Sequence, residues 1–243
     1  MVFAAGVAAG TVNTVVGSGS LITFPALLAA GYPPLVANQS NCLGLVPGSV
    51  SGAVGYRREL AGQGARLRRF GAASLSGGVV GAILLLTLPE AVFDGVVPVL
   101  VLVACVLVAV QPRLRAWLAE RHGDEHDGGP WLLAGIFLTG IYGGYFGAAQ
   151  GVILMALLSI FIADDLQRLN GVKNVLAGLV NAVAAALFVA VGQIAYGPAL
   201  LLALGSTLGG QIGGTVGRRL PPDVLRVVII VVGAVAFVKL LAD

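Results

Sequence analysis

Two short glycine-rich stretches carry groups that could bind an anion. The first glycine stretch is Gly17 to Ser20 (Gly-Ser-Gly-Ser), and the second is Gly147 to Gly151 (Gly-Ala-Ala-Gln-Gly). Glycine is unfavourable inside a helix, so each stretch predicts a break followed by a new half-helix. A helix start offers unpaired backbone N–H groups and a positive dipole end, which together favour anions. The candidate ligands are therefore the residues at these breaks: Gly17, Ser18, Gly19, Ser20, Leu21, Gln150, Gly151 and Val152.

The glycines also have a simpler explanation, because small residues let helices approach one another closely in a membrane. Gly77 and Gly81, and likewise Gly205 and Gly209, have the spacing that serves such packing. The two glycine stretches differ from these pairs because they occupy matched places in two similar halves of the chain. We therefore favour a ligand site over packing alone.

A second set of candidates consists of amide and ammonium side chains within apolar runs: Asn13, Asn38, Asn41, Lys173 and Asn174. Polar side chains inside a bilayer cost free energy and commonly line a substrate path. The ammonium of Lys173 would attract an anion, although a position about one turn into its helix would equally let it extend to the membrane surface. For each asparagine, a hydrogen bond between helices is the alternative.

Long apolar segments place these residues in a membrane. Of 243 residues, 58% are hydrophobic and 10% are charged, against about 25% charged in an average soluble domain. A run of about 20 apolar residues crosses the hydrocarbon core as a helix. Eight apolar segments follow one another: 2–30, 36–56, 70–88, 91–111, 131–162, 169–191, 196–217 and 222–241. We therefore predict an all-α, polytopic membrane protein.

Other classes of function find no support in the sequence. The net charge is +3, but the arginines lie in short loops between apolar runs, which is typical of membrane topology and not of a nucleic-acid partner. Cys42 and Cys105 are isolated, and His122 and His126 lie in a hydrophilic stretch that contains Gly123. We expect no catalytic residues, no metal site and no cofactor.

The chain divides into two repeats. Residues 1–111 form the first repeat, residues 112–130 a hydrophilic linker, and residues 131–243 the second repeat. The arginines lie on one side of the membrane if the first segment of each repeat returns to the side from which it entered. Three crossings then remain in each repeat, and the second repeat is inverted relative to the first. The loop 57–69 and the linker would both be cytoplasmic, in the inner membrane.

Motifs in both repeats are similar to those of a known family of permeases. They are the runs Asn13 to Leu28, Ala37 to Asn41, Val46 to Arg57, Gly143 to Gly151 and Arg168 to Asn174. Through them the sequence resembles the TauE/SafE family. The resemblance implies an exporter of sulfite or an organosulfonate, or more broadly a carrier of small sulfur-containing anions. The first glycine stretch has serines where many relatives carry a run of glycines.

The leading hypothesis is a secondary transporter that moves a small anion by alternating access about a site near the middle of the membrane. Its partners would be the anion, with sulfite or an organosulfonate implied by the resemblance, and the lipid bilayer. The acidic residues near apolar segments all map to helix ends, so a coupling proton or ion remains open. A homo-oligomer also remains open. The alternatives are a passive anion channel and a membrane scaffold subunit without transport of its own.

Overall fold

The described part of the molecule is entirely helical. The computed structural model describes residues 1–119, 129–215 and 222–242, and within these ranges it contains no strand. The all-α fold class is therefore confirmed. The helices of these ranges are α1 (Val2–Val15), α2 (Ser20–Ala29), α3 (Pro34–Gly55), α4 (Gly64–Thr87), α5 (Glu90–Ala119), α6 (Pro130–Tyr145), α7 (Gln150–Phe161), α8 (Leu166–Val191), α9 (Tyr196–Thr215) and α10 (Pro222–Ala242).

Two of the predicted apolar segments are each divided into two helices. Segment 2–30 forms α1 and α2, and segment 131–162 forms α6 and α7. The breaks contain left-handed backbone at Gly17 (φ 90°) and Gly147 (φ 76°). Glycine adopts this conformation readily because it has no Cβ to collide with the backbone. The helix breaks predicted at the two glycine stretches are confirmed.

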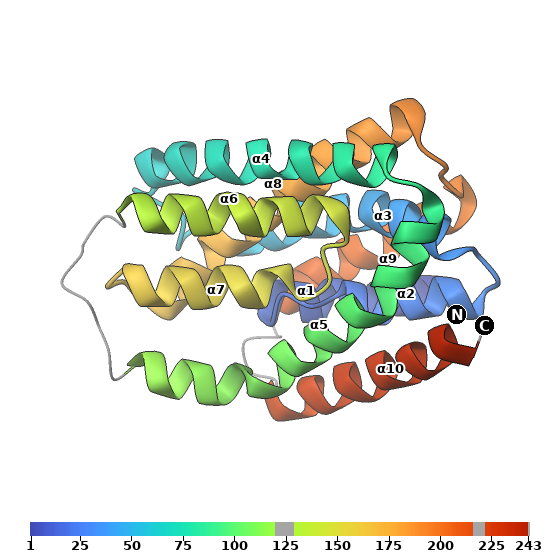
Figure 1. Ribbon diagram of the computed structural model, residues 1–243. Helices are drawn as coiled ribbons and strands as arrows, with labels where there is room; N and C mark the ends of the chain where they lie inside the picture. Colours follow the sequence, from blue (N-terminus) through green and yellow to red (C-terminus); the bar gives the residue numbers. More distant parts are fainter. Residues whose placement is uncertain (120–128, 216–221, 243) are drawn as a thin grey trace.

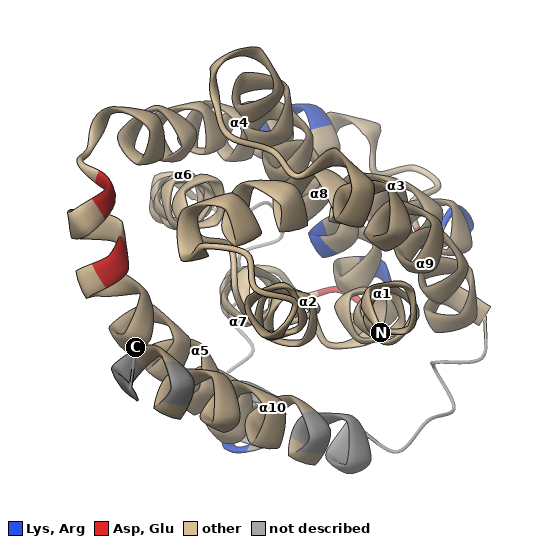
Figure 2. Cartoon of the chain, turned by 90° about the vertical axis from the view of Figure 1, so that its right-hand side faces the viewer, with Lys and Arg blue, Asp and Glu red and all other residues tan. Residues whose placement is uncertain are grey.

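The two broken segments enter the bundle from opposite ends. Figure 1 shows α1 running inward from the end at which the N-terminus lies and α2 returning toward it, whereas α6 and α7 do the same from the other end. Seen along the bundle, α2 and α7 lie near its centre, and α1 lies beside α2 (Figure 2). Gly17, Ser18 and Gln150 are buried. The breaks therefore lie inside the bundle and not at its surface.

Close backbone packing attaches the broken segments to their neighbours. Helix α1 packs against α9, and α6 packs against α4. A Cβ at Gly77 of α4 would overlap the carbonyl of Phe137 in α6. Likewise, a Cβ at Gly209 of α9 would overlap the carbonyl of Val7 in α1. The packing role expected for these two glycines is confirmed.

Within the described ranges, three helices are long and apolar enough to cross a membrane: Gly64–Thr87, Glu90–Gln111 of α5 and Leu166–Val191. Helices α3 and α9 have 22 and 20 residues, but glycine, serine and glutamine in both, and asparagine in α3, make them more polar. Asn38, Asn41 and Ser206 on these helices are buried. Protein groups, and not lipid, therefore surround these polar side chains, as a bilayer requires.

Helix α5 continues beyond the predicted end of its segment. The predicted segment stops at residue 111, whereas α5 extends to Ala119, because leucine, alanine and arginine in this stretch favour a helix although they are not uniformly apolar. Residues 120–128, with His122 and His126, lie outside the described residues. Residues 216–221, with Arg218 and Arg219, also lie outside them.

An ion-pair network joins α4 to the turn before α8. Asp164 accepts hydrogen bonds from Nη1 of Arg66 at 2.6 Å and from Nε of Arg168 at 2.9 Å. Partial burial opposes ionisation of Asp164. The hydrogen bonds from Arg66 and the Asp165 N–H, together with the charges of both arginines, outweigh this effect and hold the pKa of Asp164 below its usual range. The network fixes the turn from which α8 begins.

We expect Asp164→Asn to lower the free energy of unfolding by about 1 kcal/mol at pH 7, because the ion pairs are lost in a partly exposed place. The carboxylate contributes fully above its unfolded-state pKa of about 3.9, and the contribution is lost as the pH falls through the lower folded-state value. The gap between the unfolding midpoints of the wild type and the variant in detergent should therefore stay at its full size at pH 6 and narrow progressively as the pH falls below about 4. A gap that is independent of pH would contradict this assignment.

Candidate functional site

The two helix breaks touch each other through their backbones. The N–H of Gly151, at the start of α7, donates to the carbonyl of Gly17 across 3.0 Å. A Cβ on either glycine would lie 2.5 Å from the Cα of the other. The glycine stretches of the two halves of the chain thus meet at one junction, and neither glycine has room for a side chain there.

Two buried polar side chains at this junction lack hydrogen-bond partners. Ser18 is 1% exposed and Gln150 is 2% exposed. Within the described residues, the Oγ of Ser18 and the Nε2 of Gln150 have no hydrogen-bond partner. A buried donor without a partner costs about 1 to 3 kcal/mol, so each such group calls for an explanation. Each lies at the start of a half-helix, where the helix dipole favours negative charge.

Several backbone N–H groups that we expected to be free are already bonded. The N–H of Leu21 donates to Ser18 at 3.2 Å, that of Val152 donates to Ala149 at 2.9 Å, and that of Gly151 bonds Gly17. The expectation of free N–H groups at Leu21, Gly151 and Val152 is therefore wrong, because tight first turns and the contact between the breaks use them. The N–H groups of Ser18 and Ser20 find no acceptor within the described chain.

A small hydrogen-bond network holds the start of α2. The Nδ2 of Asn41 donates to Oγ of Ser20 at 3.2 Å, and Oγ1 of Thr23 donates to Oδ1 of Asn41. The Oδ1 of Asn13 accepts from the N–H of Gly19 at 3.4 Å. The structure thus brings Asn13, Gly19, Ser20 and Asn41 together, and adds Thr23. Sequence reasoning missed Thr23, because threonine is unremarkable in an apolar helix.

Lys173 is buried at the end of α1. It is 1% exposed, and its Nζ donates to the carbonyls of Asn13 and Thr14, each at 3.1 Å. The alternative in which Lys173 extends to the membrane surface is therefore wrong. The carboxyl end of a helix carries partial negative charge, which an ammonium complements. Asn174 and Asn170 add bonds of 3.2 Å from their Nδ2 atoms to the Thr14 carbonyl; Asn170 was not among the candidates.

Asn38 donates to the carbonyl end of α6, just as Lys173 and Asn174 donate to the carbonyl end of α1. Its Nδ2 donates to the carbonyl of Tyr145, the last residue of α6, at 2.9 Å. The carbonyl end of each broken helix is thus satisfied by a side chain from a helix of the other half of the chain. Asn38 is therefore bonded at the carbonyl end of α6.

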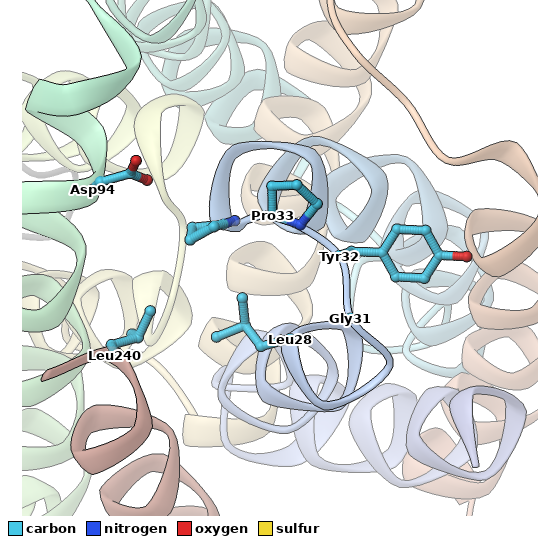
Figure 3. A pocket seen from close by; sticks show the side chains of 7 residues that line it. Leu28, Gly31, Tyr32, Pro33, Asp94 and Leu240 are labelled. Atoms are coloured by element: carbon cyan, nitrogen blue, oxygen red, sulfur yellow. The ribbon is translucent and has the colours of Figure 1, made fainter. Parts of the chain in front are cut away.

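A cavity of about 450 Å³ opens at the end of the bundle where the α2–α3 turn lies. It is lined by Leu28, Gly31, Tyr32, Pro33, Pro34, Asp94 and Leu240. Figure 3 shows the carboxylate of Asp94 extending from α5 toward Pro33, whereas the ring of Tyr32 turns away. Neither Ser18 nor Gln150 lines this cavity, so the junction lies deeper in the protein.

Comparison with known proteins places the chain in a family. A family model described as sulfite exporter TauE/SafE matches residues 2–240. The chain belongs to the TauE/SafE family. Its similarity to "Probable membrane transporter protein YfcA" of Escherichia coli (strain K12) is 26% identity over 235 residues, which cover 97% of this chain and 86% of the relative. No solved structure matches the chain.

Two further TauE/SafE relatives extend the match over the whole chain. "Probable membrane transporter protein ORF9" of Sinorhizobium is 26% identical over 244 residues, or 99% of this chain and 91% of the relative. The "Probable membrane transporter protein" of Haemophilus influenzae is 26% identical over 251 residues, or 100% of this chain and 94% of the relative. The TauE/SafE resemblance is confirmed, and the chain is a multi-pass membrane transporter of that family and not an enzyme.

We expect Gly17→Ala to destabilise the protein more than Gly31→Ala. The two glycines have nearly equal φ, 90° and 89°, but a Cβ at Gly31 meets nothing within 4 Å. Gly31→Ala should cost about 1 to 2 kcal/mol for left-handed backbone, and Gly17→Ala about 1 to 3 kcal/mol more for the overlap with Gly151. Unfolding midpoints in detergent measure the difference. Equal losses in the unfolding midpoint would show that a Cβ at Gly17 does not overlap the backbone of Gly151.

Proposed function

We propose that the chain is a secondary transporter of small sulfur-containing anions such as sulfite or an organosulfonate. The observation that carries the proposal is the pair of buried, unpartnered donors at the junction of the two helix breaks, Ser18 Oγ and Gln150 Nε2. An oxyanion offers several acceptor oxygens within one small group, so it can accept from both half-helix starts at once. The sulfur chemistry rests on the family description, sulfite exporter TauE/SafE.

The burial of the junction favours alternating access over an open channel. Ser18 and Gln150 are almost fully enclosed by protein, whereas a water-filled pore would hydrate both groups. An anion can reach them only if the packing around one break opens. The two broken segments enter from opposite ends, so opening one of them exposes the junction to one side of the membrane while the other keeps the second side closed.

The helix contacts support two inverted repeats, residues 1–111 and 131–243. Helices α1 and α3 of the first repeat pack on α9 of the second, and α6 and α8 of the second repeat pack on α4 of the first. Similarly, α2 packs on α10 and α7 packs on α5. These contacts have the same pattern in both repeats when each helix from α1 to α5 is matched in order with a helix from α6 to α10. Two such repeats with three crossings each place the loop 57–69 and the linker 112–130 in the cytoplasm, where membrane proteins concentrate arginine.

In this proposal the residues at the junction have separate roles. Ser18 and Gln150 bind the oxyanion, and the N–H groups of Ser18 and Ser20 add donors at the start of α2. Lys173 supplies positive charge from the end of α1, and Asn174 holds that end. Asn41 orients Ser20. The glycines Gly17, Gly19 and Gly151, with Leu21 and Val152, form the walls that keep the two half-helix starts close together.

Binding of anions by the purified protein tests the proposal. The panel is sulfite, thiosulfate, sulfoacetate, taurine, sulfate and chloride, measured by isothermal titration calorimetry in detergent. We expect selective binding of a sulfur oxyanion, and we expect Lys173→Met to weaken it by at least about tenfold, because a charge-assisted interaction contributes about 1.5 to 3 kcal/mol.

Asn170→Leu is the matched control for Lys173→Met. Asn170 donates to the same Thr14 carbonyl as Lys173, so the control removes a neutral bond at that place and keeps the charge. If both variants lose affinity equally, the ammonium of Lys173 serves only to hold α1. If the wild type binds none of the panel, the proposed substrate class is wrong.

A further inference from the structure

A lateral groove lies between α3 and α8 on the outer surface of the bundle. Its volume is about 390 Å³, and its lining includes Val50 and Val54 from α3 and Leu179 and Ala182 from α8, with Arg57 also contributing. Val50 is 58% exposed and Val54 is 46% exposed. In a multi-pass membrane protein, exposed apolar side chains of this kind face lipid. The groove is therefore open to the bilayer.

The groove has a charged end, formed by Arg57, and an apolar body that extends from it along α3. Arg57 lies two residues beyond Gly55, the last residue of α3. Ser49 lies about two turns, or roughly 12 Å, before Arg57 along the helix rise. Ser49 sits opposite Gly178, where an added Cβ would lie 3.2 Å from the Ser49 Cβ. This contact closes the floor of the groove. The groove thus runs from a guanidinium at the end of α3 inward along apolar side chains.

Arg57 is the charged group of the groove. No acidic residue belongs to its lining. Asp164 is paired with Arg66 and Arg168, and Arg57 is exposed. Neighbouring Arg58 is also exposed, but it does not line the groove. The groove therefore offers one guanidinium above an apolar channel, and its charge is complementary to an anion at the membrane surface.

We propose that this groove binds an anionic phospholipid. The phosphate of the headgroup pairs with Arg57, since a guanidinium matches phosphate oxygens in a bidentate geometry. One acyl chain lies along Val50, Val54 and Leu179. A zwitterionic lipid fits the same apolar channel, but its own cation reduces the attraction of its headgroup for Arg57. The groove thus selects among lipids by headgroup charge.

The bound lipid would reach a residue that holds α1. Asn174 lines the inner wall of the groove, and its Nδ2 donates to the Thr14 carbonyl at the end of α1. A lipid in the groove therefore packs against the side chain that positions the first helix break. This inference depends only on the membrane location of the chain, and it stands or falls independently of the transported anion.

Native mass spectrometry of the detergent-solubilised protein tests the site with dioleoylphosphatidylglycerol and dioleoylphosphatidylcholine at equal concentrations. We expect the wild type to retain the anionic lipid about fivefold more strongly, which corresponds to about 1 kcal/mol for one arginine near the surface. Arg57→Gln should remove this preference. Arg58→Gln, the matched control, should keep it, because Arg58 carries the same charge outside the groove.

A second variant tests the apolar channel. Ala182 is exposed on the groove wall, so Ala182→Phe fills the channel from the lipid side without entering the core and should reduce retention of both lipids. Equal losses for Arg57→Gln and Arg58→Gln would overturn the proposal, because they would indicate attraction by the arginine-rich surface as a whole. Displacement of the lipid by glycerol phosphate at equal concentration would also overturn it, since the acyl chain would then add nothing.

Discussion

The fold depends on how it satisfies backbone that is not helical inside a membrane. Hydrocarbon offers no hydrogen bonds, so each N–H and C=O freed by a helix break needs a partner from the protein. The two breaks partly supply one another, through the Gly151 N–H and the Gly17 carbonyl. This contact requires glycine on both sides, because a Cβ at either position meets the other backbone. The meeting of the breaks brings together the backbones of Gly17 and Gly151, which are the chain neighbours of Ser18 and Gln150.

The carbonyl ends of the broken helices depend on side chains from the opposite half of the chain. Lys173 and Asn174 of α8 hold the end of α1, and Asn38 of α3 holds the end of α6. Burying an ammonium costs several kcal/mol unless it is well bonded. Lys173 meets this condition through two carbonyls that already carry the negative end of a helix dipole. Lys173 therefore holds the end of α1, and in the proposed function its charge would also attract the anion.

The sequence predicted the helix breaks and the glycine packing because both follow from local composition. Gly17 and Gly147 interrupt apolar runs at matched places, and glycine adopts left-handed backbone more readily than residues with a side chain. The burial of Lys173 could not be predicted, since one turn of helix separates a buried ammonium from one at the surface. The use of the Gly151 N–H could not be predicted either, because its partner lies in the other half of the chain. Thr23 and Asn170 act only through neighbours that tertiary packing supplies.

If the Ser18 hydroxyl is kept unpartnered for an anion, its removal should change the stability of the anion-free protein and the stabilisation by the anion in opposite directions. Thermal unfolding of Ser18→Ala in detergent, with and without the best-binding anion, measures both at once. Removing a buried, unpaired hydroxyl should raise the midpoint of the anion-free protein, while the stabilisation by the anion should fall as binding weakens. Ser74→Ala is the control, because its buried hydroxyl donates to the Leu176 carbonyl and its loss should lower the midpoint. A Ser18→Ala protein that is less stable than the wild type without anion, and is stabilised by the anion as much as the wild type is, would show that the Ser18 hydroxyl does not bind the anion.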